Sequence, residues 1–159
     1  MNTKTEFQEF VSRVTNFIVN DPSFKKYWQS APYSKFLSEN LRRYSEYTED
    51  NKCIINNLDR MMQQCRMSQE AKDLIQRLGA RKWDSGLNKH IHREHLFPVG
   101  EAVRQLGRLS VDPSEAGVEE ILNKLELVLI TKEQQRKLDK VMKSVGEPEE
   151  RADYVGGVF

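Results

Sequence analysis

Apolar residues recur at three- and four-residue spacing through the first half of the chain, and this period predicts a series of helices. Thr5 and Gln8 form a capping box ahead of the first helix, and Asp21-Pro22 ends it. Aromatic residues mark two further short helices, one after Pro22 and one after Pro32. The last two helices of the series are expected at about 52–66 and 69–78.

The helical period is lost after this series. Residues 80–89 show no helical spacing and contain a turn-like cluster of small and polar residues. A short helix is expected after Pro98. Another helix is expected from Asp112-Pro113 to about Leu125, because Asp is typical of an N-cap and Pro of the first helical position.

The most strand-like segment is LELVLI, residues 125–130. Thr131 and Gln134 then form a capping box for a final helix, with Gly146 as its stop. The pattern as a whole predicts a mainly α protein with a helical N-terminal half and two short strands in the second half.

Composition limits the possible functions. The chain has 159 residues, of which 38% are hydrophobic and 31% charged, with a formal net charge of +1. This balance is typical of a globular domain and excludes a general polycation, so any affinity for nucleic acid must come from a local patch. No apolar run approaches the ~18 residues needed to cross a bilayer, and the first residues lack a signal-peptide pattern. We therefore expect a cytoplasmic protein that does not enter a membrane.

Both cysteines, Cys53 and Cys65, fall in the helix expected at 52–66. Twelve residues of helix would separate them by about 18 Å, whereas bridged Cα atoms lie within about 7 Å of each other. Met61 and Met62 belong to the same segment, which indicates an apolar environment. We expect two reduced, buried thiols rather than metal ligands or nucleophiles.

All three histidines lie in the stretch KHIHREHLFPVGE, residues 89–101. An extended conformation is preferred there, because Pro98 disfavours a helix through the residue before it. Alternation along a strand would place His90, His92 and Glu94 on one face. Imidazole and carboxylate together suit a divalent metal, and an imidazole that does not bind the metal takes a proton from water. The alternative is that these histidines make structural polar contacts.

Basic residues and one tryptophan surround the histidine stretch. Lysine and arginine attract phosphate, and tryptophan stacks on bases, so these residues are candidates for nucleic-acid binding. The alternative is a solvated basic loop. The candidates are Arg77, Arg81, Lys82, Trp83, Lys89 and Arg93.

Two segments resemble the halves of an HNH nuclease motif. REHLFPV, residues 93–99, resembles the first half, in which an acidic residue or a histidine precedes the general-base histidine and a proline follows. LVLITKEQQRKLDK, residues 127–140, resembles a degenerate second half, in which a strand leads through a threonine into a helix with polar metal ligands. The resemblance covers about the last third of the chain and implies a ββα-metal unit that hydrolyses phosphodiester bonds with Mg²⁺ or Mn²⁺.

The resemblance also implies a role for individual side chains. His95 would be the general base, and Arg136 would stabilise developing negative charge. The chain departs from the family in having no histidine after His95 and no CxxC pair, so a degenerate, inactive site is an open alternative. The implied metal ligands are Glu94, Asp139, Gln135 and His92.

Two functions of different classes remain open. The first is a metal-dependent nuclease, or a nucleic-acid-binding protein derived from one. The second is a non-enzymatic helical regulator, for example an inhibitor encoded by a phage or mobile element, whose aromatic N-terminal helices bind a protein partner. Either function is expected in one domain, with a helical part at 1–79, a ββα-metal-like part at 80–146 and a tail at 147–159.

Overall fold

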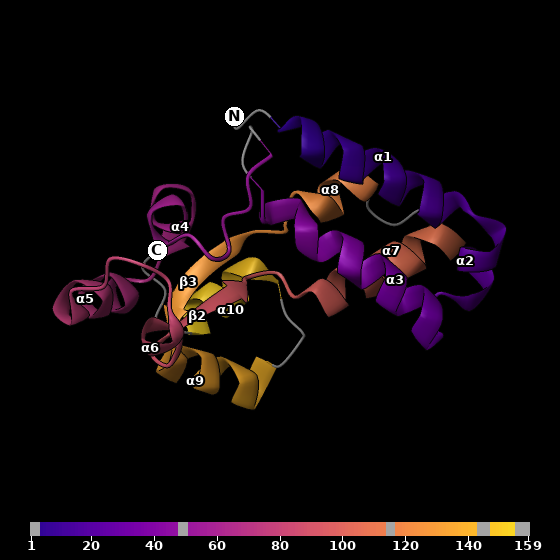
Figure 1. Cartoon of the computed structure of the whole chain (residues 1–159). Helices are drawn as coiled ribbons and strands as arrows, with labels where there is room; N and C mark the ends of the chain where they lie inside the picture. The colour runs from indigo at the N-terminus through magenta and orange to yellow at the C-terminus, as the bar shows by residue number, and fades with distance from the viewer. Residues whose placement is uncertain (1–3, 48–50, 114–116, 143–146, 155–159) are drawn as a thin grey trace. The chain divides into compact units, whose positions relative to one another are not determined.

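The computed structural model describes residues 4–47, 51–113, 117–142 and 147–154 (Figure 1). The chain divides into two compact units, each built from two separate stretches of sequence. The first unit combines Met1–Lys52 with Pro98–Leu125, and the second combines Cys53–Phe97 with Glu126–Phe159. This division differs from the expected boundary after residue 79, because the helix that follows Pro98 packs with the N-terminal helices.

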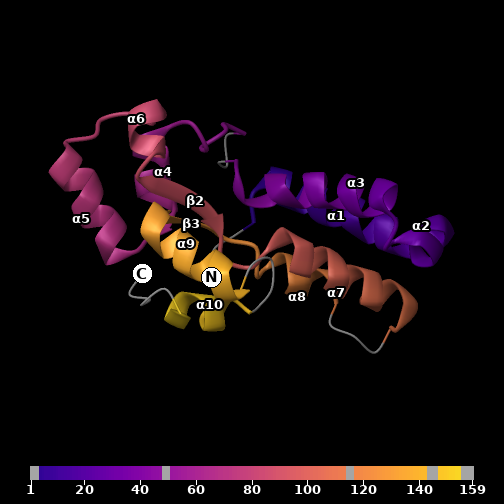
Figure 2. The same cartoon turned by 90° about the horizontal axis from the view of Figure 1, so that it is seen from below.

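The first unit is helical, and its helices form two layers in Figure 2, with α1 and α3 in one layer and α7 and α8 in the other. The expected capping box is confirmed: the Thr5 hydroxyl accepts the N–H of Gln8, whose side chain accepts the N–H of Thr5. Asp21 ends the first helix and caps the second. The elements are α1 (Glu6–Asn20), α2 (Pro22–Tyr27), α3 (Ala31–Arg42), the 3-10 helix η1 (Arg43–Ser45), α7 (Val99–Val111) and α8 (Val118–Leu122).

The predicted start of the helix from Asp112-Pro113 to about Leu125 is wrong. Asp112 instead ends α7, which runs to Val111, and α8 begins only at Val118 after Gly117. The apolar side of α7 stays buried as far as Ser110, so packing against α1, α2 and α3 extends this helix up to the Asp-Pro pair. The packing is tight at Gly107, where a Cβ would lie 2.2 Å from the ring of Trp28.

The second unit holds a three-stranded sheet with the order β1-β3-β2. The central strand β3 pairs parallel with β1 and antiparallel with β2. The strand expected at 125–130 and the capping box of Thr131 and Gln134 are both confirmed. The elements are α4 (Leu58–Gln64), β1 (Arg66–Met67), α5 (Gln69–Leu78), α6 (Ser85–Asn88), β2 (Ile91–His95), β3 (Leu127–Thr131), α9 (Lys132–Met142) and α10 (Pro148–Tyr154).

Every residue of β3 is buried, because helices cover both faces of the sheet. Leu127 and Leu129 on one face join an apolar cluster with residues of α4, α5 and α6. Val128 and Ile130 on the other face pack with Leu96 and with Ala152 of α10. The sheet therefore has two separate cores, one per face. The expected fold class, mainly α with a small sheet, is confirmed.

Two expectations about the second unit are wrong. Residues 52–66 do not form one helix, because Asn57 caps a shorter helix by accepting the N–H of Arg60. The tail expected from residue 147 contains the helix α10. The expected stop at Gly146 lies outside the described residues.

No helix in the described part of the chain is long and apolar enough to cross a lipid bilayer.

The broken helix changes the expectation for the cysteines. Both are free, as expected, but Cys53 is exposed, so the expectation that it is buried is wrong. Cys65 is half-buried, and burial together with the nearby Glu126 raises the pKa of its thiol to about 11.

We predict that the two thiols react at very different rates. At pH 8 a thiol with a pKa near 11 is roughly 10⁻³ thiolate, and the thiolate is the reactive form. Titration of the native protein with a thiol reagent should therefore give one fast phase, which Cys53→Ser removes, and one slow phase that accelerates as the pH rises. Equal rates for both thiols would contradict the assigned burial.

Candidate functional site

Residues Ile91–His95 of the histidine stretch form the edge strand β2, in the extended conformation that was predicted, and His90 lies just before it. Successive side chains of a strand point to opposite faces of the sheet. His92 and Glu94, which lie opposite Ile130 and Val128, belong to the face covered by α10. Arg93 and His95 belong to the other face. The expected metal ligand Glu94 and the expected general base His95 therefore do not converge.

Both carboxylate oxygens of Glu94 already have partners. Its Oε1 accepts a hydrogen bond from Arg151 Nη2 at 2.7 Å, and its Oε2 lies 2.9 Å from His92 Nε2. Arg151 is only 1% exposed and also donates to the backbone carbonyl of Met142 at the end of α9. The ion pair thus connects α10 to β2, and the hydrogen bond to Met142 connects it to α9.

A further cation lies on the same face of the sheet. Lys132 Nζ, at the start of α9, is 3.5 Å from His92 Nδ1. Glu94 therefore lies in a cluster with three basic side chains, His92, Lys132 and Arg151. This charge balance does not fit a divalent metal, because a cation at Glu94 would have to displace Arg151 and face Lys132.

The other expected ligands lie on α9. Asp139 is exposed, and its Oδ2 accepts a long hydrogen bond of 3.5 Å from Gln135 Nε2, one turn earlier. Arg136 is exposed on the same helix. Within the described residues, no group of three or more His, Cys, Asp or Glu side chains is arranged to hold a metal ion.

The expected nucleic-acid-binding residues fall into two groups. The Arg93 guanidinium lies 5.0 Å from the centre of the Trp83 ring, and it donates to the carbonyl of Ile55 and, at 3.2 Å, to Asn56 Oδ1. The guanidinium thus covers one face of the Trp83 ring, and Trp83 also packs against the apolar core. The remaining four candidates, Arg77, Arg81, Lys82 and Lys89, are exposed.

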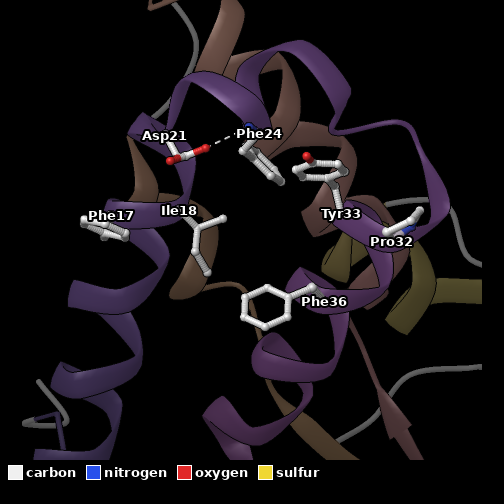
Figure 3. A pocket seen from close by; sticks show the side chains of 7 residues that line it. All are labelled: Phe17, Ile18, Asp21, Phe24, Pro32, Tyr33 and Phe36. Atoms are coloured by element: carbon white, nitrogen blue, oxygen red, sulfur yellow. Dashed lines mark hydrogen bonds between the residues drawn. The ribbon is translucent and has the colours of Figure 1, made fainter.

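A second candidate site lies in the first unit, between α1 and α3. Figure 3 shows Ile18 of α1 facing Tyr33 and Phe36 of α3 across a hollow, with Phe17 on the outer side of α1. The hollow has a volume of about 300 Å³ and is closed at one end by Phe24 and Asp21. We name it the aromatic pocket. It is lined by Phe17, Ile18, Asp21, Phe24, Pro32, Tyr33 and Phe36.

The same two helices enclose a second hollow of about 480 Å³ towards the start of α1. Phe10 lines this second hollow, and Phe10 and Phe17 lie two helical turns apart on α1. The side chains of Phe10, Phe17 and Phe36 are 53%, 75% and 59% exposed. We call the two hollows together the α1–α3 groove. The second hollow is lined by Phe7, Phe10, Val11, Val14, Asn40, Arg43, Tyr47 and Asn51.

No protein-family model, curated protein or solved structure matches the chain, so the function is inferred from its own residues.

We predict that Glu94→Gln lowers the free energy of unfolding on the order of 3 kcal/mol, because it removes the carboxylate charge that pairs with the buried guanidinium of Arg151. Chemical denaturation measures the change. The matched control is Glu126→Gln, which removes the carboxylate of the exposed pair between Arg66 and Glu126 and should cost at most about 1 kcal/mol. Equal losses in the two variants would contradict a structural role for the Glu94 pair.

Proposed function

We propose that this protein is a non-enzymatic binding module that holds a partner protein in the α1–α3 groove. The observation that supports this most directly is the exposure of three phenylalanines, Phe17 and Phe36 at the aromatic pocket and Phe10 at the second hollow. Large exposed aromatic side chains grouped around a concavity are typical of protein-protein interfaces, where aromatic residues supply much of the binding energy.

The contrast between the two candidate sites also supports this proposal. At the histidine stretch, Glu94 and Arg151 neutralise each other and fasten one helix to the sheet, which is a structural role. In the groove, by contrast, Phe17 and Phe36 leave more than half of their side-chain surface exposed. Binding of a partner would bury this apolar area, which stabilises a complex by about 25 cal/mol per Å² before the costs of association are counted.

The test is a binding measurement with groove variants. Phe17→Asp and Phe36→Asp should each weaken binding of a captured partner protein at least ~10-fold, because each places a charge where the partner must exclude water. Both side chains are largely exposed, so the variants should keep the wild-type unfolding midpoint.

The matched control is Val111→Asp, a substitution of another exposed apolar side chain in the same unit, outside the groove. It should leave partner binding unchanged. The proposal is wrong if Val111→Asp weakens binding as much as Phe36→Asp does, or if neither phenylalanine variant weakens it.

A metal-dependent nuclease, or a nucleic-acid binder derived from one, is the second candidate. The observation that favours it is the group of four exposed cations at Arg77, Arg81, Lys82 and Lys89. For metal-dependent cleavage, Glu94 would first have to exchange Arg151 for a metal ion. The origin from a phage or mobile element also stays a prediction.

An activity assay decides on this second candidate. If His95 is a general base, His95→Ala should lower cleavage of DNA or RNA by roughly 10²–10⁴-fold while the protein stays folded. The assay uses Mg²⁺ and Mn²⁺ in turn, with circular dichroism as the control for folding. A wild-type protein that cuts neither nucleic acid with either metal excludes the nuclease, and one that also binds neither excludes the derived binder.

A further inference from the structure

We infer that the aromatic pocket is a cage for a methylated lysine side chain of the partner protein. This inference rests on the proposed function and names the chemical group that the partner places in the pocket. It follows from the rings that border the pocket and from the charged group in its lining.

Three aromatic rings border the hollow. Figure 3 shows Phe24 of α2 and Tyr33 and Phe36 of α3 around it, with Ile18 of α1 opposite. Phe24 is 2% exposed and is therefore held by the core, whereas Tyr33 is half-buried and Phe36 is exposed. The face of an aromatic ring is negative, so a cation within about 6 Å of the ring centre is attracted to it. Several rings around one hollow are the arrangement by which proteins bind methylated ammonium groups.

The size and polarity of the pocket suit such a group. Its volume of about 300 Å³ is at the lower end of the range for ligand pockets, so it matches a side chain rather than a larger ligand. An unmodified lysine ammonium has three N–H donors, which an apolar lining would leave without acceptors. A trimethylated ammonium has no N–H to donate and presents methyl groups to the lining, so it keeps its charge without this cost.

Asp21 supplies the matching negative charge. It is the one charged residue in the described lining of this pocket. Its Oδ1 accepts the N–H groups of Ser23 and Phe24 at 2.9 and 3.1 Å, which caps α2 and holds the carboxylate in place. Figure 3 draws the bond to Phe24. No described group donates a hydrogen bond to Oδ2, so this oxygen is available to a cation.

A neighbouring ring already binds an ammonium group. Lys26 Nζ lies 5.0 Å from the centre of the Tyr27 ring, and the centres of the Tyr27 and Tyr33 rings are 5.7 Å apart. Tyr27 lies outside the pocket lining, whereas Tyr33 belongs to it. The same aromatic cluster therefore contains an example of the interaction that we infer for the pocket.

Charges farther from the pocket do not select the ligand. The same three helices carry exposed residues of both signs, among them Glu9, Glu39, Arg13 and Lys25. Arg13 also lines a neighbouring shallow hollow together with Asp21. Selection therefore depends on direct contact with the rings and with Asp21, and salt screens such close contacts less than it screens distant charges.

The probes for the test are three short peptides that differ at one position and are otherwise made of glycine. The first carries trimethyl-lysine, the second carries a neutral analogue in which a tert-butyl group replaces trimethylammonium, and the third carries unmodified lysine. NMR titration of the full chain should show that the trimethylated peptide binds at least ~5-fold more tightly than either of the others, because it alone combines a cation with an apolar surface. The difference should remain at ~0.5 M salt.

Substitutions at Phe36 test the contribution of the ring. Phe36→Leu keeps an apolar side chain but removes the ring, so it should abolish the preference for the trimethylated peptide over its neutral analogue. Phe36→Tyr keeps a ring and should preserve the preference. The matched control is Val111→Ala, at another exposed apolar side chain of the same unit outside the pocket, and it should leave all three affinities unchanged.

Asp21→Asn tests the contribution of the carboxylate. Asparagine also caps helices, so α2 should stay in place in this variant. Binding of the trimethylated peptide should become roughly 3-fold weaker, while binding of the neutral analogue should stay the same. Equal weakening of both peptides would overturn this role of Asp21.

Other outcomes overturn the inference and separate it from the proposed function. Equal binding of the trimethylated peptide and its neutral analogue, or no binding of either at ~10 mM, overturns the inference, and the proposed function is then decided by the groove variants alone. A preference that Phe36→Leu leaves intact places the cation elsewhere and also overturns it. Binding to phosphatidylcholine vesicles that depends on Phe36, without binding of the trimethylated peptide, would identify a lipid headgroup as the occupant and overturn both proposals.

Discussion

The ion pair between Glu94 and Arg151 is the interaction on which the second unit depends. Arg151 is almost fully buried, and a buried guanidinium requires a carboxylate close by. Because its partner is in β2 and its other contact is the end of α9, the pair determines where α10 lies on the sheet. Both carboxylate oxygens of Glu94 thus have a bonded partner, Arg151 for one and His92 for the other.

Local signals in the sequence were sufficient for much of the fold. The capping boxes at Thr5 and Thr131, the strand before Thr131 and the extended histidine stretch all depend on residues within a few positions of one another. The predictions were wrong where contacts between residues far apart in the sequence determine whether a helix forms or where it ends. Packing of α7 against α1, α2 and α3 carries that helix up to Asp112, and the ion pair of Arg151 with Glu94 fixes a helix in a segment that reads as a polar tail.

The two candidate sites also differ in how far the sequence alone could predict them. Residue types drew attention to Glu94 and His95, but alternation along one strand places them on opposite faces, so adjacency in sequence did not produce a shared site. The groove had a weaker signal. At 100° per residue, Phe10 and Phe17 fall on the same edge of the apolar stripe of α1, and Phe17 lines the aromatic pocket together with Phe36 of α3. Only the packing of the two helices reveals that these side chains remain exposed.

The central claim is that this protein acts through the α1–α3 groove and that its histidine stretch is structural. Hydrogen-deuterium exchange, measured on the unmodified chain alone and in complex with a captured partner protein, tests this claim most directly. Binding should slow exchange in α1 and α3 and leave β2 and α9 unchanged. Slower exchange in β2, α9 and the basic segment from Arg77 to Lys89, with α1 and α3 unchanged, would contradict it.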